Sequence, residues 1–197
     1  MTRRWLLVLL PLALSACGYN TIQTLDEQAS AGQGQIEVQL QRRADLIPNL
    51  VQTVKGFANQ ELAVFGEVAR ARSGLLGAVQ SKDPEQMAAA NQQMTGALGR
   101  LLVVSEAYPQ LKSDQGFLKL QDELAGTENR VGVSRQDYNT AVQQYNTFIK
   151  KFPAVLTAKM TGAKEKKYFA VTGGTSRDAP SVDFGTPGAA TPAPAKP

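Results

Sequence analysis

The chain has 197 residues and a formal net charge of +4, with one cysteine and no histidine. These counts exclude an intramolecular disulfide, a Ser-His-Asp triad and histidine-ligated metal sites, so we expect neither a metal nor a cofactor. The basic and acidic residues are interspersed and form no aromatic-basic stripe, which excludes the usual signature of a nucleic-acid partner.

The N-terminal residues predict a bacterial lipoprotein signal. Four residues with two positive charges precede nine uncharged, mostly apolar residues, a run too short to cross a bilayer, which needs about 20 apolar residues. The sequence Leu14-Ser15-Ala16-Cys17 that follows resembles the lipobox, in which the chain is cut between Ala16 and Cys17 and the cysteine is acylated, for example with palmitate. We therefore expect residues 1–16 to be removed and residues 17–20 to be the lipid anchor and a linker. A plain signal peptide with a chance cysteine is the alternative.

This signal also predicts where in the cell the protein is located. Two or three acyl chains anchor a protein durably, because each buried methylene contributes about 0.8 kcal/mol. Loss of Arg3 and Arg4 lowers the net charge from +4 to +2, so the mature chain is nearly neutral. In lipoproteins of double-membraned bacteria an Asp after the cysteine tends to retain the protein at the inner membrane. Gly18 stands there instead. We expect a periplasm-facing protein at the outer membrane rather than the inner one.

Apolar residues repeat in steps of three and four along four segments, which predicts an all-α fold. These seams run from Ile22 to Leu40, from Ile47 to Ala78, from Met87 to Leu111 and from Phe117 to Phe152, with Glu61 as a polar member of the second. No stretch alternates with period two for long enough to be a strand. We predict one domain over residues 21–169, an up-and-down four-helix bundle of long antiparallel helices.

Helix boundaries are marked by capping residues and prolines. Asp83 followed by Pro84 predicts a helix start, and Ser113 or Asp114 predicts the cap of the last helix. The break at residues 45–48 has two interpretations: Asp45 caps a new helix, or Pro48 kinks one helix running from about residue 21 to 80. Residues 170–197 form a Gly/Pro/Ala-rich tail that we expect to be disordered after about residue 185.

A polar stripe borders the apolar seam of the last helix. Its members, which the helical repeat places on one face, are Glu128, Arg135, Asn139, Gln143 and Asn146, with Gly132 between the first two. One hypothesis is internal: the amides and Glu128 bind an arginine of a neighbouring helix, Arg43 or Arg72. The other is that the stripe binds a partner protein.

Several polar motifs along the seams resemble those of the LemA family of bacterial membrane-anchored proteins. They are Tyr19-Asn20, residues 43–51, Ala71-Arg72-Ser73, Glu106-Ala107-Tyr108-Pro109, Thr127-Glu128-Asn129-Arg130, Tyr138-Asn139, Tyr145-Asn146, Phe152-Pro153 and Pro180-Ser181-Val182-Asp183-Phe184. The polar residues of these motifs that we single out are Arg43, Asp45, Asn49, Arg72, Glu106, Tyr108 and Arg130. The resemblance covers roughly residues 19–184. It implies a four-helix bundle outside the cytoplasm, held to a membrane by its N-terminus, with no enzymatic activity. Many members begin with a transmembrane helix, whereas here the lipobox-like motif takes its place.

Three classes of function fit this sequence. We favour a membrane-anchored, non-enzymatic module of the cell envelope that serves as a scaffold for other envelope proteins. The second class is a cell-wall-glycan-acting enzyme that uses carboxylates alone, with Glu61 or Glu106 as the acid. The third is a ligand or lipid carrier with a site between the helices, lined by Tyr108, Tyr138 and Tyr145.

Overall fold

The computed structural model describes residues 2–170, with side chains from Gly18 onward, and every regular element in this range is an α-helix. The all-α prediction is therefore confirmed, while the predicted disorder after about residue 185 lies outside the described residues. The helices are α1 (Thr2–Phe57), α2 (Leu62–Ser81), α3 (Pro84–Ala107), α4 (Pro109–Lys112), α5 (Gln115–Lys150) and α6 (Ala154–Thr161).

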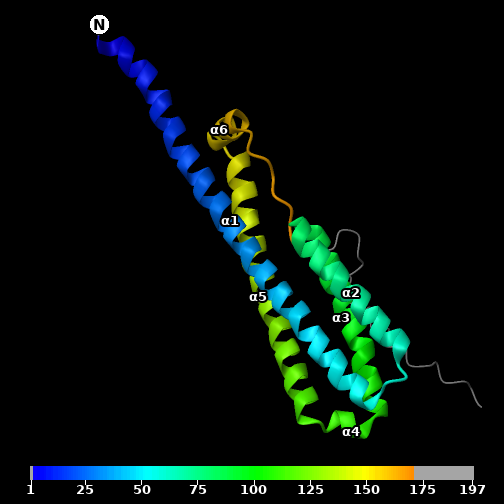
Figure 1. Cartoon of the computed structure of the whole chain (residues 1–197). Helices are drawn as coiled ribbons and strands as arrows, with labels where there is room; N and C mark the ends of the chain where they lie inside the picture. The colour runs from blue at the N-terminus through cyan, green and yellow to red at the C-terminus, as the bar shows by residue number, and fades with distance from the viewer. Residues whose placement is uncertain (1, 171–197) are drawn as a thin grey trace, which may run out of the picture.

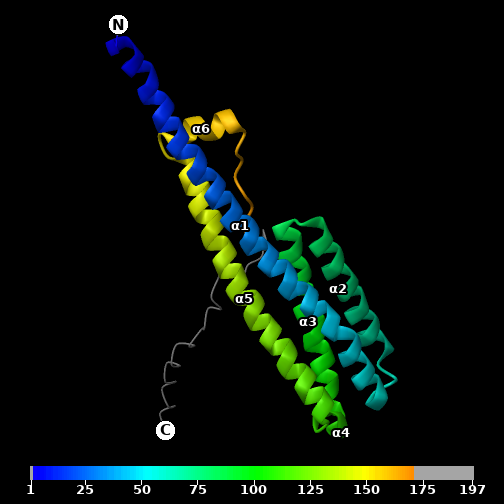
Figure 2. The same ribbon diagram turned by 60° about the vertical axis from the view of Figure 1, so that its left-hand side comes forward.

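Four of these helices alternate in direction and form the bundle. Figures 1 and 2 show α1 and α5 side by side and antiparallel, with α2 and α3 packed as a hairpin beside the C-terminal half of α1. The 36 residues of α5 span about 54 Å, but the 20 residues of α2 span only about 30 Å. Only one half of the rod is therefore a four-helix bundle. In the other half, α1 and α5 are accompanied by α6 and the segment that follows it.

The predicted apolar seams supply the core. Ile36 and Leu50 of α1, Leu75 of α2, Met94 of α3 and Tyr138 of α5 are all almost completely buried. A second, smaller cluster lies where α6 meets the N-terminal half of α1 and the C-terminal end of α5, and consists of Ile22, Tyr145, Ile149 and Ala158. Two residues that the seams include are exposed, Phe57 to 42% and Phe152 to 81%, because each stands at or beyond the end of its helix.

Helix α1 runs without a break through Pro48, which selects the single-helix interpretation of residues 45–48. A proline has no N–H, so the carbonyl of Ala44, four residues earlier, lacks its helical donor. Arg72 of α2 replaces that donor: its Nε donates to the Ala44 carbonyl oxygen over 2.8 Å. A side chain of α2 thus supplies the hydrogen bond that the proline removes from the backbone of α1.

The predicted continuation of this helix to about residue 80 is wrong, because the chain turns at residues 58–61. Glu61 is the residue before α2 and has no side-chain capping bond. The turn folds α2 back so that Phe65 and Val68 pack in the same core as Val54. The apolar seam keeps its spacing across the turn, and the spacing therefore gave no sign of it.

Capping residues set the starts of the other helices. Asp83 accepts hydrogen bonds from the backbone N–H groups of Glu85 and Gln86, with Pro84 in the first turn of α3. Asp114, rather than Ser113, caps α5 by accepting from the N–H of Phe117 over 2.8 Å.

Candidate functional site

The polar stripe of α5 faces an extended stretch of chain that the sequence did not predict. Helix α6 ends at Gly162, whose φ of 72° lets the backbone leave the helix. Residues 162–170, which we call the returning segment, then run back along α5 towards the turn between α2 and α3 (Figure 1, orange). Neither α6 nor the returning segment stands out by periodicity, because one is only eight residues long and the other is extended.

Two asparagines of the stripe bind the backbone of the returning segment through both the oxygen and the nitrogen of their side-chain amides. Asn146 accepts from the N–H of Lys166 over 2.8 Å and donates to the Lys166 carbonyl over 2.9 Å. Asn139 makes the same pair of bonds with Phe169, over 2.9 and 3.3 Å. Seven helical residues rise about 10.5 Å and three extended residues span about 10 Å, so the two spacings match. The predicted arginine partners of these amides are therefore wrong.

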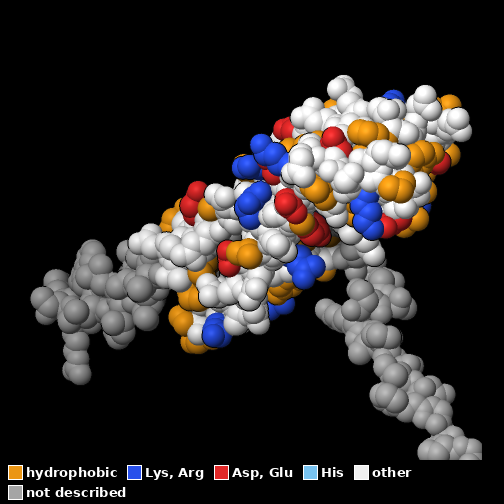
Figure 3. Space-filling view, turned by 90° about the horizontal axis from the view of Figure 1, so that it is seen from below, with side chains coloured by type: hydrophobic (Ala, Val, Ile, Leu, Met, Phe, Trp, Pro, Cys, Tyr) orange, Lys and Arg blue, Asp and Glu red, His pale blue; other side chains and the backbone are white. Residues whose placement is uncertain are grey.

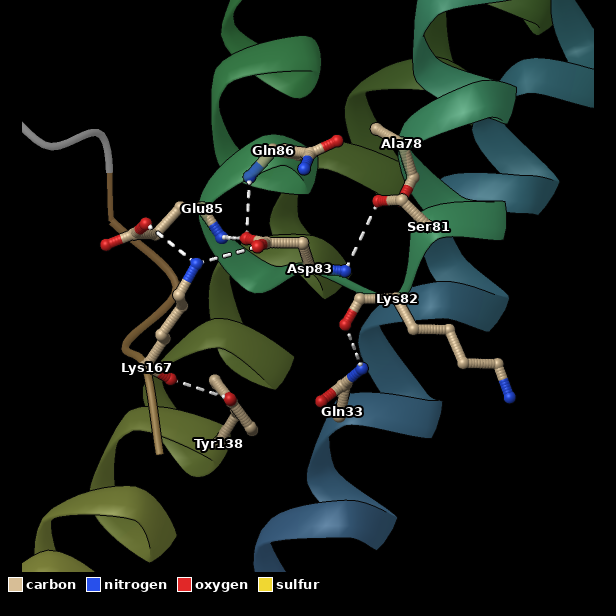
Figure 4. Close-up of polar contacts among 9 residues, drawn as sticks. All are labelled: Gln33, Ala78, Ser81, Lys82, Asp83, Glu85, Gln86, Tyr138 and Lys167. Atoms are coloured by element: carbon tan, nitrogen blue, oxygen red, sulfur yellow. Dashed lines mark hydrogen bonds and ion pairs between the residues drawn. The ribbon is translucent and has the colours of Figure 1, made fainter. Parts of the chain in front are cut away.

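Tyr138, next to Asn139 in the sequence, adds a third attachment at Lys167, which lies between Lys166 and Phe169. The hydroxyl of Tyr138 donates to the Lys167 carbonyl over 2.7 Å. Burial, with a smaller contribution from Asp83, raises the pKa of Tyr138 to about 12, so the phenol remains a protonated donor. The side chain of Lys167 points away from α5 towards α3 (Figure 4).

Lys167 joins the returning segment to the start of α3. Its Nζ lies 2.7 Å from Asp83 Oδ2 and 3.3 Å from Glu85 Oε2. The bond from Lys167, and after it the backbone bonds at the helix start, lower the pKa of Asp83 despite some desolvation. Asp83, followed by Glu85, raises the pKa of Lys167 in return. Figure 4 also shows Gln33 of α1 donating to the Lys82 carbonyl over 2.9 Å, so α1, α3, α5 and the returning segment meet here.

Close contact between α1 and α5 at this level depends on a glycine. A Cβ on Gly32 would lie 3.2 Å from the Cα of Tyr138, whereas a Cβ on Gly34 would have no heavy atom within 4 Å. Gly32 thus lies at a close approach of the two backbones, where a side chain would press on α5.

A second polar cluster lies inside the four-helix half, centred on Arg43. This arginine is only 3% exposed and donates to Asn91 Oδ1 over 2.5 Å and to Thr95 Oγ1 over 3.1 Å. It also forms an ion pair with Glu128 of α5, the partner expected for the first residue of the stripe. Burial lowers the pKa of Arg43, and Glu128 opposes that shift. The cluster ties α1 to α3 and to α5.

The remaining family-motif residues are spread over the surface of the bundle. Arg130 donates to Gln39 over 3.2 Å, and Asp45 accepts from Gln41 over 3.0 Å. Asn49 is exposed, and its carbonyl accepts from the Thr53 hydroxyl. Within the described residues, Arg135 makes no hydrogen bond or ion pair, and Gln143 lies at the edge of a surface depression. The structure therefore does not gather the whole stripe into one site.

The candidate catalytic acids, Glu61 and Glu106, and the candidate ligand-lining tyrosines make contacts with other residues of the fold. Glu106 is exposed and paired with Lys112 over 2.5 Å, while Glu61 Oε1 lies 3.5 Å from the hydroxyl of Tyr108. Tyr138 and Tyr145 are buried under the returning segment and α6.

Two surface depressions, of about 550 and 390 Å³, are open to solvent. Their linings are Gln23, Thr24, Glu27, Gln28 and Ala31 in one, and Leu25, Gln143, Gln144, Thr147, Phe148 and Lys151 in the other. Neither is an enclosed cavity of the kind that a carrier would need between its helices.

Comparison with known proteins gives a family and similar proteins from two organisms. The sequence model described as "LemA family" matches residues 32–184. Magnetosome protein MamQ 2 of Paramagnetospirillum magneticum is 30% identical, in a match covering 77% of this chain and 64% of the relative. Magnetosome protein MamQ of Magnetospirillum gryphiswaldense is 29% identical with the same coverage. The chain thus spans less than two thirds of the length of these relatives.

Over the residues that the structure describes, none of the helices combines the length and apolar character needed to cross a bilayer.

Proposed function

The chain belongs to the LemA family, and from this premise we propose that it is a membrane-anchored, non-enzymatic scaffold of the bacterial cell envelope. The observation that carries the proposal is the use of the polar stripe. Its Glu128, Asn139 and Asn146 hold the chain's own elements together, so groups that would otherwise serve a substrate have a structural role. The product of these contacts is an elongated rod with long outer faces on α1 and α5, which suits a module that binds other proteins.

We assign the anchor to Cys17, on the sequence Leu14-Ser15-Ala16-Cys17. The chain purified from membranes is expected to begin at Cys17 and to carry acyl groups there, which intact-mass and N-terminal peptide mass spectrometry detect. Cys17→Ser is expected to abolish acylation and processing, whereas the matched control Ser15→Ala keeps a small residue before the cysteine and should be acylated normally. A mature N-terminus elsewhere, with no acyl mass on Cys17, contradicts the assignment.

Site-specific photo-crosslinking in cells tests the scaffold role. A photoreactive residue replaces Val133, which is 61% exposed on the outer face of α5, or in a second variant Val38, which is 59% exposed on α1. A scaffold is expected to give a small, reproducible set of envelope-protein adducts at one of these positions, and Cys17→Ser should remove them, because the chain then lacks the acyl anchor that places it among its partners. The same faint background at both positions, with or without the anchor, contradicts the scaffold role.

A further inference from the structure

Helix α6 places its large apolar side chains outward and its small ones inward. Ala154 and Ala158, four residues apart, are each 4% exposed and pack towards α1 and α5. Leu156 and Met160, two positions further on, lie on the opposite side of the helix. They are 55% and 87% exposed, and Phe152 just before the helix is 81% exposed. Single exposed apolar residues are common on protein surfaces, but three within nine residues form a patch.

Lysines without ion-pair partners surround this patch. Residues 150–167 contain six lysines and one acidic residue, Glu165, which pairs with Lys150 over 2.8 Å. Lys166 and Lys167 pair with acids elsewhere in the fold. The other three, Lys151, Lys159 and Lys164, are exposed and make no ion pair within the described residues. The space-filling view in Figure 3 shows hydrophobic side chains and a basic one together at the left-hand end of the coloured surface.

Helix α6, which carries the patch on its outward face, lies beside the residue that follows the proposed lipid site. A Cβ on Gly18 would lie 3.4 Å from Thr157 Oγ1, so residue 18 of α1 is in contact with α6. Tyr19, the next residue, is 45% exposed. An acyl chain on Cys17 would therefore bring α6, and not the far end of the rod, to the bilayer.

We propose that the outward face of α6 docks on the anionic surface of the membrane that anchors the chain, with Phe152, Leu156 and Met160 entering the interface. The proposal builds on the lipid anchor proposed above and adds the orientation of the bundle. Apolar residues flanked by lysines are the composition that binds this interface, because the apolar groups leave water and the ammonium groups remain at the phosphates. An isolated helix of eight residues would be unstable, but α6 is already held by its contacts with α1 and α5.

A single tryptophan reports on this docking. Cleavage before Cys17 already removes Trp5, the only tryptophan of the sequence, and Trp5→Leu keeps any unprocessed chain from contributing emission. Met160→Trp then places a single tryptophan in the patch. The protein is reconstituted in vesicles of phosphatidylethanolamine and phosphatidylglycerol with brominated acyl chains. The matched control is Val103→Trp. This position is 70% exposed and lies near the C-terminal end of α3, at the end of the rod away from α6. We expect blue-shifted emission and several-fold stronger quenching for Met160→Trp than for Val103→Trp.

The outcomes separate docking from anchoring. Equal, weak quenching at both positions, with an acyl mass on Cys17, overturns the docking while leaving the anchor intact, and is the result expected if α6 binds a protein instead. Quenching at Met160→Trp without an acyl mass supports the docking and overturns the anchor. Replacing Lys151, Lys159 and Lys164 by Gln should reduce the quenching on anionic vesicles. If quenching is unchanged by this replacement and equal on phosphatidylcholine, the anionic surface is the wrong partner.

Discussion

At the scale of single residues, Asn139 and Asn146 act as a neighbouring strand would, offering one donor and one acceptor to each of two backbone positions. Asparagine is a mediocre helix former, and its repetition after seven residues indicated from the sequence alone that these positions had a specific use. The partner could not be predicted, because the returning segment has no periodicity and reaches α5 only after the chain has reversed at α6.

We expect Asn146→Ala to lower the free energy of unfolding by roughly 1–3 kcal/mol, because the amide and carbonyl of Lys166 lose both bonds. Gln143→Ala, at an exposed position of the same stripe, is the control and should change the free energy by less than about 0.5 kcal/mol. Urea unfolding followed by circular dichroism measures both. Equal effects of the two substitutions would show that the bonds to the returning segment contribute nothing.

The contact of Arg72 with the Ala44 carbonyl gives a second residue-scale prediction. Arg72→Ala should destabilise the fold by about 1–3 kcal/mol, because it leaves the carbonyl opposite Pro48 without a donor. The cost should be smaller in a Pro48→Ala background, where the helix regains an N–H at residue 48. Unfolding free energies of the four variants in a double-mutant cycle should give a coupling of at least about 0.5 kcal/mol. Strict additivity would contradict the compensation.

At the scale of elements, the apolar seams predicted the α-helical character of the bundle and most of its buried faces, since burial of one face imposes its period on the sequence. The seam from Ile47 to Ala78, however, joined the end of α1 to α2. Two features were not predictable in this way. The turn at residues 58–61 preserves the period, and the unequal lengths of α2 and α5 depend on that turn. Capping chemistry predicted the start of α3 at Asp83 because a local interaction sets it.

The approach of α1 to α5 predicts opposite outcomes for two nearby glycines. Gly34→Ala should stabilise α1 by up to about 1 kcal/mol, because alanine is the better helix former and the new methyl meets no heavy atom within 4 Å. Gly32→Ala should leave the stability of the protein unchanged or lower it, because its methyl would press on the Tyr138 backbone at 3.2 Å. Thermal melts of the two variants make the comparison. An equal rise in melting temperature would mean that the helices separate at no cost.

The lowered pKa of Asp83 predicts a dependence of stability on pH. A group whose pKa is lower in the folded state stabilises the fold fully above its unfolded value of 3.8, and this contribution is lost as the pH falls through the folded pKa. Asp83→Asn keeps the helix cap and removes the charge. Its melting temperature should lie below that of the unaltered protein at pH 7, and the gap should begin to narrow below about pH 4 and close as the pH falls through the lowered pKa of the folded state. In a Lys167→Gln background the gap at pH 7 should be much smaller, and an unchanged gap would contradict the role of Lys167.

At the scale of the whole molecule, the rod consists of two halves that differ in the number of helices packed around their core. One half has four helices around a continuous core and the buried Arg43 cluster, while the other has α1, α5, α6 and the returning segment. Local stability generally follows the density of buried apolar contacts. The sequence could not predict this division, because it arises from where the chain turns and not from any single segment.

Hydrogen exchange followed by mass spectrometry should resolve the two halves. Amides of α1 near Ile22 and of α5 near Ile149 should exchange through a partial opening, at a lower free energy than amides near Leu50 and Phe117, which should need global unfolding. Asn146→Ala should speed exchange only in the first group, because it loosens only the half that carries α6. Uniform protection along α1 would mean that the rod unfolds as one unit.

The pairing of α1 with α5 has a consequence for the order in which the protein folds. The side chain of Gln39 meets that of Arg130, 91 positions later, so the first helix finds its main partner only after most of the chain has been made. Until then the apolar face of α1 towards α5 is open to water and to other chains, while α2 and α3 can already form their hairpin. A nascent chain of this protein is therefore most exposed to aggregation at its beginning. We expect holding chaperones to bind its first helix longest, and to be released when α5 emerges.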